Sequence, residues 1–131
     1  MKHRVIILAA GMGSRLKPYT NEIPKCMVKV NGKSILEYQL ELFQNKQINK
    51  INIVGGYKIE KLKKYGLPLI YNENYDSTNM VYSLYKAIDL LKGNIIISYG
   101  DIIYSEETLK TLLNSDGDIV IASDKNWKSY W

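Results

Sequence analysis

The chain has 131 residues, enough for one domain that removes roughly two-thirds of its unfolded surface from water. Its composition, 46% hydrophobic and 24% charged residues, is that of a globular protein and argues against a disordered or repetitive one. Cys26 is the only cysteine and His3 the only histidine, which excludes an internal disulfide and argues against a histidine metal cluster or a Ser-His-Asp triad.

Five short apolar runs alternate with stretches of helical spacing along the chain. We predict strands at residues 5–8, 51–54, 68–71, 95–98 and 119–122. Each run is nearly continuous in apolar residues, which is typical of strands covered on both faces. Alternation of this kind predicts right-handed crossovers into a mostly parallel sheet flanked by helices, a Rossmann-like α/β fold in a single domain over residues 1–131.

Three stretches between the predicted strands carry apolar residues at helical spacing. They begin near Leu36, Val81 and Leu109, and serines stand where N-caps belong, at Ser34, Ser77 and Ser105. A further basic stretch at 57–66 has the spacing of a solvated helix with one apolar stripe.

The net charge of +5 fits a small polyanion such as a nucleotide as well as it fits nucleic acid, and we expect no nucleic-acid partner. The basic N-terminus followed by residues 5–10 imitates a secretory signal, but this apolar run is too short for one. No segment approaches the roughly eighteen apolar residues of a membrane span. We therefore expect a cytoplasmic protein without a membrane partner, and leave a homo-oligomer open.

A glycine-rich stretch, LAAGMGSR at 8–15, directly follows the first predicted strand. Ligands of such sheets gather at the carboxyl ends of strands. Gly11 and Gly13 allow backbone geometry and close approach that a Cβ would block, and consecutive amides in such a turn form a concavity for anionic oxygens. Arg15 adds a bidentate donor that matches phosphate. The stretch therefore predicts a phosphate-binding loop.

Two other phosphate loops match this chain poorly. The dinucleotide fingerprint has a third glycine where this chain has Leu16, and the acid expected about twenty residues later is absent, which disfavours a dehydrogenase. NGKS at 31–34 resembles the end of a P-loop, but Met27 stands where the first glycine belongs. We interpret 31–34 as a tight turn before the helix capped by Ser34.

A longer signature resembles that of the nucleotidyltransferases that make sugar nucleotides and related CDP-alcohols. All its fixed positions are occupied over twenty consecutive residues: Leu8, Ala9, Ala10, Gly11, Gly13, Ser14, Arg15, Leu16, Pro18, Thr20, Pro24, Lys25 and Met27. The resemblance implies a GT-A-like nucleotidyltransferase fold, with a nucleoside triphosphate bound by Leu8 to Gly11, Gly13 and Ser14. It places Arg15 and Lys25 on the phosphates. Lys25 alone could be an ordinary solvated lysine, but Pro24 presents it from a stiff stem.

An acidic residue follows the fourth predicted strand, in SYGDIIY at 98–104. Asp101 comes after a buried strand, and Gly100 gives its backbone room at the nucleotide. A carboxylate there can hold a Mg²⁺ that also keeps waters and phosphate oxygens. By itself Asp101 could equally cap a turn. In the resembling family the acid at this place binds the catalytic metal, which makes Asp101 a candidate catalytic and metal-binding residue.

Two further stretches are candidates for recognising the base. Gly55 lies at the end of the second predicted strand, and Asn79 opens a helix, where it could instead serve only as a cap. The pattern around Asn79 and 98–101 looks most like cytidylyltransferases that act on phosphocholine, aminoethylphosphonate or similar phospho-alcohols. This resemblance implies CTP as the nucleotide.

Aromatic residues gather after the last predicted strand, at Trp127, Tyr130 and Trp131. They could cover the core, or Trp127 could form an aromatic wall for a cationic acceptor through cation–π attraction. They follow the strand predicted at 119–122 and would lie on the same edge as Asp101 if the sheet is parallel, as the interpretation of Trp127 as an aromatic wall requires.

The resemblance implies an enzyme, a Mg²⁺-dependent nucleotidyltransferase that passes CMP from CTP to a phosphate or phosphonate acceptor and releases pyrophosphate. Such chemistry needs no protein nucleophile, which suits a chain with one histidine. Members of the family are usually much longer, with a further half that completes the acceptor pocket, so we expect the N-terminal half of the usual domain here. Two alternatives stay open: a non-catalytic nucleotide-binding piece, and a sugar-1-phosphate nucleotidyltransferase that uses another nucleotide.

Overall fold

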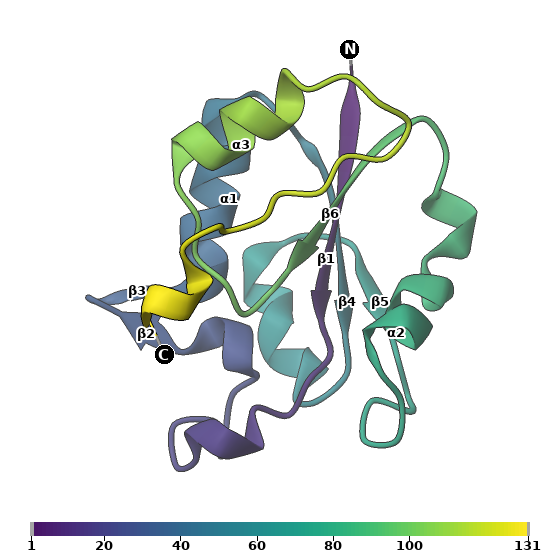
Figure 1. The fold of residues 1–131 in the computed structure, drawn as a ribbon. Helices are drawn as coiled ribbons and strands as arrows, with labels where there is room; N and C mark the ends of the chain where they lie inside the picture. Colours follow the sequence, from purple (N-terminus) through teal and green to yellow (C-terminus); the bar gives the residue numbers. More distant parts are fainter. Residues whose placement is uncertain (1, 131) are drawn as a thin grey trace.

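A four-stranded parallel sheet forms the centre of the structure, a computed structural model that describes residues 2–130. The strands are β1 (His3–Ala9), β4 (Lys50–Gly55), β5 (Leu69–Tyr71) and β6 (Asn94–Tyr99), in the order β5-β4-β1-β6. Figure 1 shows β1 in the middle of the sheet, running in the same direction as its neighbours. The four strands confirm the predictions at residues 5–8, 51–54, 68–71 and 95–98.

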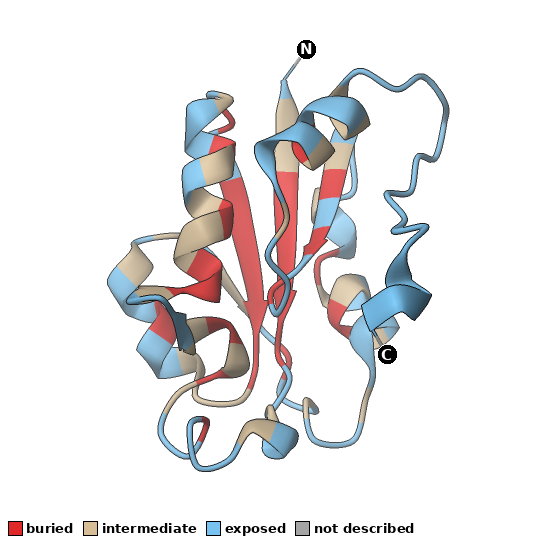
Figure 2. Ribbon diagram, turned by 60° about the vertical axis from the view of Figure 1, so that its left-hand side comes forward, coloured by how far each residue is buried: buried red, intermediate tan, exposed pale blue. Residues whose placement is uncertain are grey.

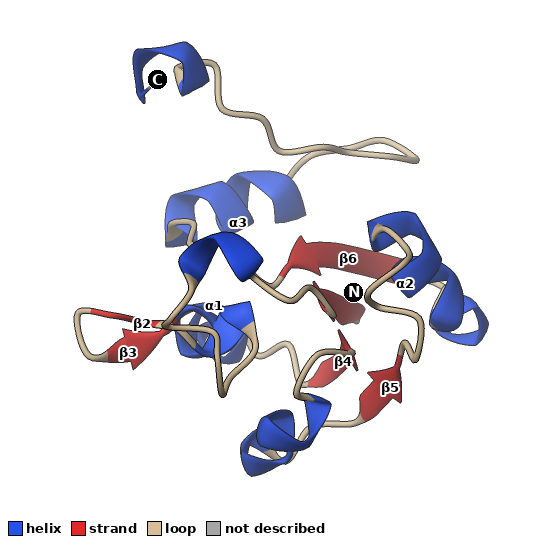
Figure 3. Cartoon of the chain, turned by 90° about the horizontal axis from the view of Figure 1, so that it is seen from below, coloured by secondary structure: helices blue, strands red, loops and turns tan. Residues whose placement is uncertain are grey.

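Helices cover both faces of this sheet, as the predicted α/β fold requires. α1 (Ile35–Asn45) and α3 (Glu106–Leu113) lie over one face, and α2 (Met80–Lys86) lies over the other (Figure 3). The buried residues concentrate along the central strands and the inner sides of the helices (Figure 2). The larger core cluster includes Val5, Ile7, Leu36, Phe43, Ile53 and Leu109, and the smaller one Ile6, Leu8, Val54 and Ala87.

Shorter elements connect the layers. β2 (Lys29–Val30) and β3 (Lys33–Ser34) form an antiparallel hairpin whose two turn residues both have positive φ, 53° at Asn31 and 82° at Gly32. These angles favour an Asn-Gly turn and confirm the predicted tight turn at 31–34. The described part of the chain also contains 3-10 helices: η1 (Ser14–Leu16), η2 (Lys25–Met27), η3 (Ile59–Tyr65), η4 (Ile88–Leu90) and η5 (Trp127–Tyr130).

Two of the three predicted N-caps are confirmed. Ser34 forms a capping box with Glu37 at the start of α1, and the Ser105 hydroxyl accepts from the backbone amide of the third residue of α3. The prediction for Ser77 is wrong. α2 begins at Met80 because the side-chain oxygen of Asn79 accepts from the backbone amide three residues later, while the Ser77 hydroxyl bonds within the preceding turn.

The stretch predicted as one apolar helix face from residue 81 onward is divided between α2 and η4. Val81 and Tyr85 point their apolar groups to solvent, and the buried positions of this segment are Ser83 and Ala87. Small residues therefore face the sheet here, which lets α2 pack closely on β1 and β4. Within residues 2–130, every helix is too short or too polar to cross a bilayer.

The fifth predicted strand, at 119–122, does not form. Ile119 and Ile121 are 84% and 82% exposed, and the segment runs outside the sheet (Figure 1). An apolar run gives a segment strand propensity, but a strand also needs a neighbour that takes its backbone hydrogen bonds. No other segment among residues 2–130 pairs with 119–122, so its β propensity is not realised.

Candidate functional site

The order of the strands places a ligand-binding crevice beside β1. The chain passes from β1 to β4 and then to β5 on one side, and returns to β6 on the other side of β1. In open parallel sheets, ligands bind at the carboxyl ends of the strands where the order reverses in this way. The segments after Ala9 and Tyr99 therefore border the expected position of a ligand.

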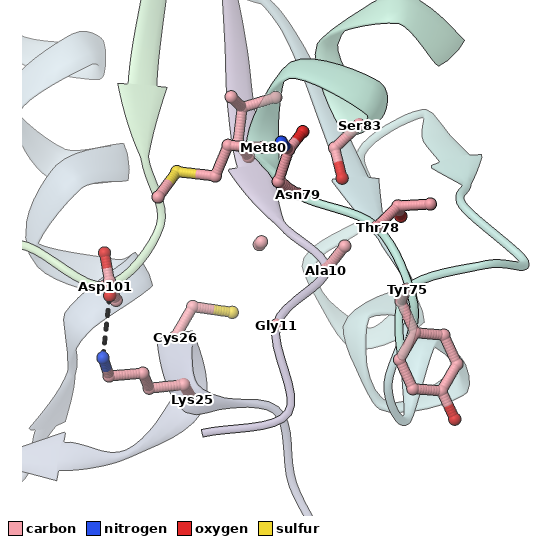
Figure 4. A pocket seen from close by; sticks show the side chains of 12 residues that line it. Ala10, Gly11, Lys25, Cys26, Tyr75, Thr78, Asn79, Met80, Ser83 and Asp101 are labelled. Atoms are coloured by element: carbon pink, nitrogen blue, oxygen red, sulfur yellow. Dashed lines mark hydrogen bonds and ion pairs between the residues drawn. The ribbon is translucent and has the colours of Figure 1, made fainter. Parts of the chain in front are cut away.

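A pocket of about 250 Å³ lies at this position (Figure 4). It is lined by residues that follow β1, by η2, by the start of α2 with the turn before it, and by the loop after β6. The lining residues are Leu8, Ala9, Ala10, Gly11, Lys25, Cys26, Tyr75, Thr78, Asn79, Met80, Ser83 and Asp101.

The two glycines of the predicted phosphate loop differ in their surroundings. Gly11 borders the pocket, and a Cβ built on it would meet no atom within 4 Å. Gly13 has a φ of +62°, and a Cβ there would lie 2.9 Å from Cγ2 of Thr20 and 3.0 Å from Cβ of Lys25. Gly11 thus leaves backbone open to a ligand, whereas Gly13 makes room for the stem of Lys25.

The loop between Gly13 and Lys25 is fixed by the side chains of Thr20 and Tyr57. The Thr20 hydroxyl, fully buried, donates to the Gly13 carbonyl at 2.7 Å. The Tyr57 hydroxyl lies 2.8 Å from the Thr20 carbonyl oxygen and 3.0 Å from the Asn21 carbonyl oxygen, and donates to them. The position of the loop is therefore fixed by side chains that do not line the pocket.

Lys25 and Asp101, which are 76 residues apart in the sequence, meet at the pocket. Lys25 Nζ lies 2.8 Å from Asp101 Oδ2, and the two side chains are 38% and 37% exposed (Figure 4). Pro24, with φ −66° and ψ 156°, precedes η2 and leads the chain into Lys25. An ion pair as exposed as this contributes little to stability. Its two charges remain accessible to a ligand in the pocket.

Gly100 fits the loop after β6 closely against β1. Its amide donates to the Leu8 carbonyl at 2.9 Å, and a Cβ on it would lie 2.9 Å from Ala9 Cβ and 3.1 Å from the Leu8 oxygen. A side chain at this position would therefore push Asp101 away from the end of β1.

The opposite wall of the pocket is organised by a buried asparagine outside it. Asn72 donates from Nδ2 to the hydroxyls of Thr78, at 3.2 Å, and Ser83, at 2.9 Å. Asn79 lines the pocket and also caps α2 through Oδ1, so the capping role predicted as an alternative is confirmed. Its side-chain Nδ2 has no hydrogen bond to any residue that the structure describes.

Cys26 lines the pocket next to Lys25 but is almost completely buried. Burial raises the pKa of its thiol to about 12, and the charge of Asp101 adds to this effect. The thiol therefore stays protonated near neutral pH in the ligand-free site and is a poor nucleophile there.

Several predicted site residues lie outside the pocket lining. Ser14 and Arg15 belong to η1 and are exposed; the Arg15 side chain has no partner among the described residues. Gly55 is buried, and a Cβ on it would lie 2.8 Å from a side chain of η3. Close packing against η3 therefore explains why a glycine stands at this position. Trp127 is 55% exposed on η5 and does not line the pocket, because 119–122 does not join the sheet.

Sequence reasoning missed five lining residues: Cys26, Tyr75, Thr78, Met80 and Ser83. Cys26 could have been included because it follows Lys25 within the signature. The other four come from the turn before α2 and from α2 itself. Their contribution depends on how α2 packs on the sheet, which no local pattern reveals.

Oxygen ligands for a metal are few at this site. No cluster of three or more histidine, cysteine, aspartate or glutamate side chains occurs among residues 2–130, and Asp101 is the carboxylate that lines the pocket. Mg²⁺ is commonly held by one or two carboxylates together with waters and substrate phosphates. The donor set therefore fits Mg²⁺ that arrives with a nucleotide better than a metal held by protein alone.

Comparison with known proteins places this geometry among nucleotidyltransferases. CTP:phosphoglutamine cytidylyltransferase from Campylobacter jejuni is 41% identical over 96% of this chain and 54% of that protein. Choline-phosphate cytidylyltransferase from Streptococcus pneumoniae is 43% identical over 72% of this chain and 43% of that protein. These relatives confirm the predicted resemblance. The chain spans about half the length of the curated relatives it matches.

Solved structures agree with this assignment. A CTP:phosphocholine cytidylyltransferase from Streptococcus pneumoniae superposes with a TM-score of 0.71 at 41% identity, over 77% of this chain and 46% of that one. The inositol-1-phosphate CTP transferase of T. maritima shares the fold with a TM-score of 0.74 at 21% identity. Residues 5–129 match the family described as the MobA-like NTP transferase domain. Because this match covers nearly the whole chain, the protein belongs to the family of MobA-like NTP transferase domains.

Proposed function

We propose that the chain forms the nucleotide-binding part of a cytidylyltransferase, which transfers CMP from CTP to a small phospho-alcohol or phosphonate and releases pyrophosphate. The observation that carries the proposal is the Lys25–Asp101 pair, which faces the open backbone of Gly11 across one pocket. The names of the relatives, which act on phosphoglutamine and choline phosphate, support this class of acceptor.

The pocket suits part of a nucleotide. Its volume of about 250 Å³ is below the range of about 300–1,000 Å³ that is typical of drug-sized ligands. Exposed amides at Gly11 would bind phosphate oxygens, and the ammonium group of Lys25 would neutralise their charge. The free side-chain amide of Asn79 is the candidate donor to the base edge.

The reaction requires positioning more than acid–base chemistry. An oxygen of the acceptor phosphate, already ionised near pH 7, attacks the α-phosphorus of CTP. The bond from that phosphorus to the oxygen bridging the β-phosphate breaks, and pyrophosphate leaves with the bonding electrons. Lys25 and the loop amides hold the triphosphate in line and stabilise the charge on its oxygens. Arg15, exposed on η1 and without a partner among the described residues, is free to contact a phosphate.

We propose Mg²⁺ as the cofactor, with Asp101 as its protein ligand. When bound, the ion would supply charge neutralisation on the phosphate oxygens. In the structure Lys25 pairs with Asp101, so a cation already occupies one side of the carboxylate. Asp101 would then hold the metal with its remaining oxygen lone pairs, while Lys25 keeps the carboxylate oriented.

The test combines calorimetry and product analysis. CTP should bind more tightly with Mg²⁺ than without it, and Asp101→Asn should keep the fold while removing the effect of Mg²⁺. Asp89→Asn is the matched control, because Asp89 is exposed on η4 and does not line the pocket. If Asp101→Asn and wild type show the same Mg²⁺ dependence, the metal assignment is wrong.

A second candidate is a non-catalytic nucleotide-binding unit, because the residues that line the pocket would bind a nucleotide whether or not a reaction follows. Incubation with CTP and a panel of phosphocholine, phosphonate and sugar-1-phosphate acceptors separates the two. Formation of a CDP product supports the enzyme. Tight CTP binding without product from any acceptor supports the binding unit, and a preference for another nucleoside triphosphate would point to sugar nucleotide synthesis.

A further inference from the structure

A buried glutamine on α1 lies behind the loop that carries Asp101. Gln39 is 0% exposed, and its Nε2 donates to the Tyr99 carbonyl at 2.6 Å and to the Ile102 carbonyl at 2.7 Å. These two carbonyls stand on either side of Gly100 and Asp101. One side-chain amide therefore spans the segment that presents the carboxylate.

The side-chain oxygen of Gln39 also has a hydrogen-bond partner. Gln39 Oε1 accepts from the hydroxyl of Ser98 at 2.8 Å, and that hydroxyl lies 2.8 Å from the hydroxyl of Tyr104. The Tyr104 ring packs edge-on against Phe43 of α1, with ring centroids 6.5 Å apart. The segment from Ser98 to Tyr104 therefore contacts α1 at both ends, through Ser98 and Tyr104, and also between them, through the two carbonyls bonded to Gln39.

A polar residue at this position interrupts the apolar face of α1. Leu36 and Phe43, which flank it at helical spacing, are both fully buried in the main core cluster. A buried amide is costly unless all its groups are bonded, and here both donors and the acceptor have partners. An apolar residue would fill the space but would leave the carbonyls of the loop without donors.

We propose that Gln39 is a positioning residue for the nucleotidyl transfer site: it holds the loop of Asp101 so that the carboxylate meets Lys25 and the metal. This inference rests on the role proposed for Asp101. Gln39 has no contact with the pocket and acts only through the loop. It should therefore change what Asp101 does and leave the binding of the nucleotide without metal nearly unchanged.

The test compares Gln39→Met, similar in size but unable to donate, with wild type. The measured quantity is the factor by which Mg²⁺ tightens CTP binding in calorimetry. We expect Gln39→Met to reduce this factor by about tenfold, or about 1.4 kcal/mol, with CTP affinity in the absence of Mg²⁺ kept. Gln44→Met, on the exposed side of the same helix, is the matched control. Ile53→Val, a change in the buried sheet, controls for loss of stability alone.

A double substitution separates this inference from the proposed function. If Gln39 acts through Asp101, Gln39→Met should have no further effect on the Mg²⁺ factor in an Asp101→Asn background. If Asp101→Asn alone leaves the factor unchanged, the proposed role of Asp101 fails. If Asp101→Asn removes the factor and Gln39→Met does not lower it, the role of Gln39 fails while that of Asp101 stands.

Amide hydrogen exchange tests the role of Gln39 in the absence of any ligand. Hydrogen exchange of the Gly100 amide, which is buried and donates to the Leu8 carbonyl, should become faster in Gln39→Met than in Gln44→Met, because the loop has lost the side-chain amide that spans it. Unchanged exchange of the Gly100 amide would overturn the proposal whatever the binding data show.

Discussion

Replacing each glycine of the phosphate loop by alanine should separate the two roles that the structure gives them. Gly13→Ala forces a side chain into a left-handed conformation, which costs about 1–2 kcal/mol. Its Cβ would also lie 2.9 Å from Thr20 and 3.0 Å from Lys25, and crowding of this kind costs about 1–3 kcal/mol. Thr20 is fully buried and bonded to the Gly13 carbonyl, so it cannot easily move. We expect the free energy of unfolding to fall by about 2–5 kcal/mol.

Gly11→Ala is the matched comparison, because a Cβ there meets no atom within 4 Å and its φ is not in the left-handed region. The free energy of unfolding should change by less than about 0.5 kcal/mol. The new methyl group would stand where a phosphate is proposed to approach the backbone, so CTP should bind at least about tenfold more weakly.

Urea unfolding followed by circular dichroism measures the first effect, and calorimetry with CTP measures the second. The reasoning is refuted if Gly11→Ala binds CTP as tightly as wild type. It is also refuted if the two variants lose the same amount of stability.

Three further predictions concern the cationic side chains of Arg15 and Lys25, the unpaired segment at 119–122 and the thiol of Cys26. Arg15→Ala and Lys25→Ala should each weaken CTP binding by about 1.5–3 kcal/mol. The free energy of unfolding should change little, because both side chains are substantially solvent-accessible. Unchanged CTP affinity in both variants would contradict the assignment of the phosphate loop. Ile121→Ser should leave stability within about 0.5 kcal/mol of wild type, whereas Ile53→Ala should cost about 2–5 kcal/mol, and equal losses would show that Ile121 is packed after all. Because burial raises the pKa of Cys26 to about 12, iodoacetamide should label it slowly at pH 8 in the folded chain and rapidly in urea; rapid labelling of the folded chain would mean that the thiol is exposed or ionised.

The strands that position the site were predictable because their requirements are local. A continuous apolar run such as that of β1 has to be covered on both faces, and the parallel order then brings the segments after β1 and β6 to one edge. Gly11 and Asp101 follow these strands directly, so their place at the pocket could be inferred from the sequence alone. Lys25 lies in no strand, and its place came from the family signature.

Whether the segment at 119–122 forms a strand could not be predicted from its own residues. Its apolar pattern matches that of β6, yet β6 is paired with β1 and 119–122 is paired with nothing in residues 2–130. The β propensity of a segment depends on its own residues, but the segment forms a strand only when a second segment takes its backbone hydrogen bonds. The prediction for Trp127 failed to gain support for the same reason, since its position depended on that strand.

Gln39 carries a signal that could have been read from the sequence. It occupies an inward position on α1 between Leu36 and Phe43, where the helical period calls for an apolar residue. A polar side chain at such a position has to find partners, and in this structure the partners of its amide group are the carbonyls of Tyr99 and Ile102. The interruption of the apolar face therefore indicates that polar groups are packed against the helix. In this chain the loop with these two carbonyls carries Asp101, so the residue that breaks the pattern of the core also fixes the carboxylate of the site.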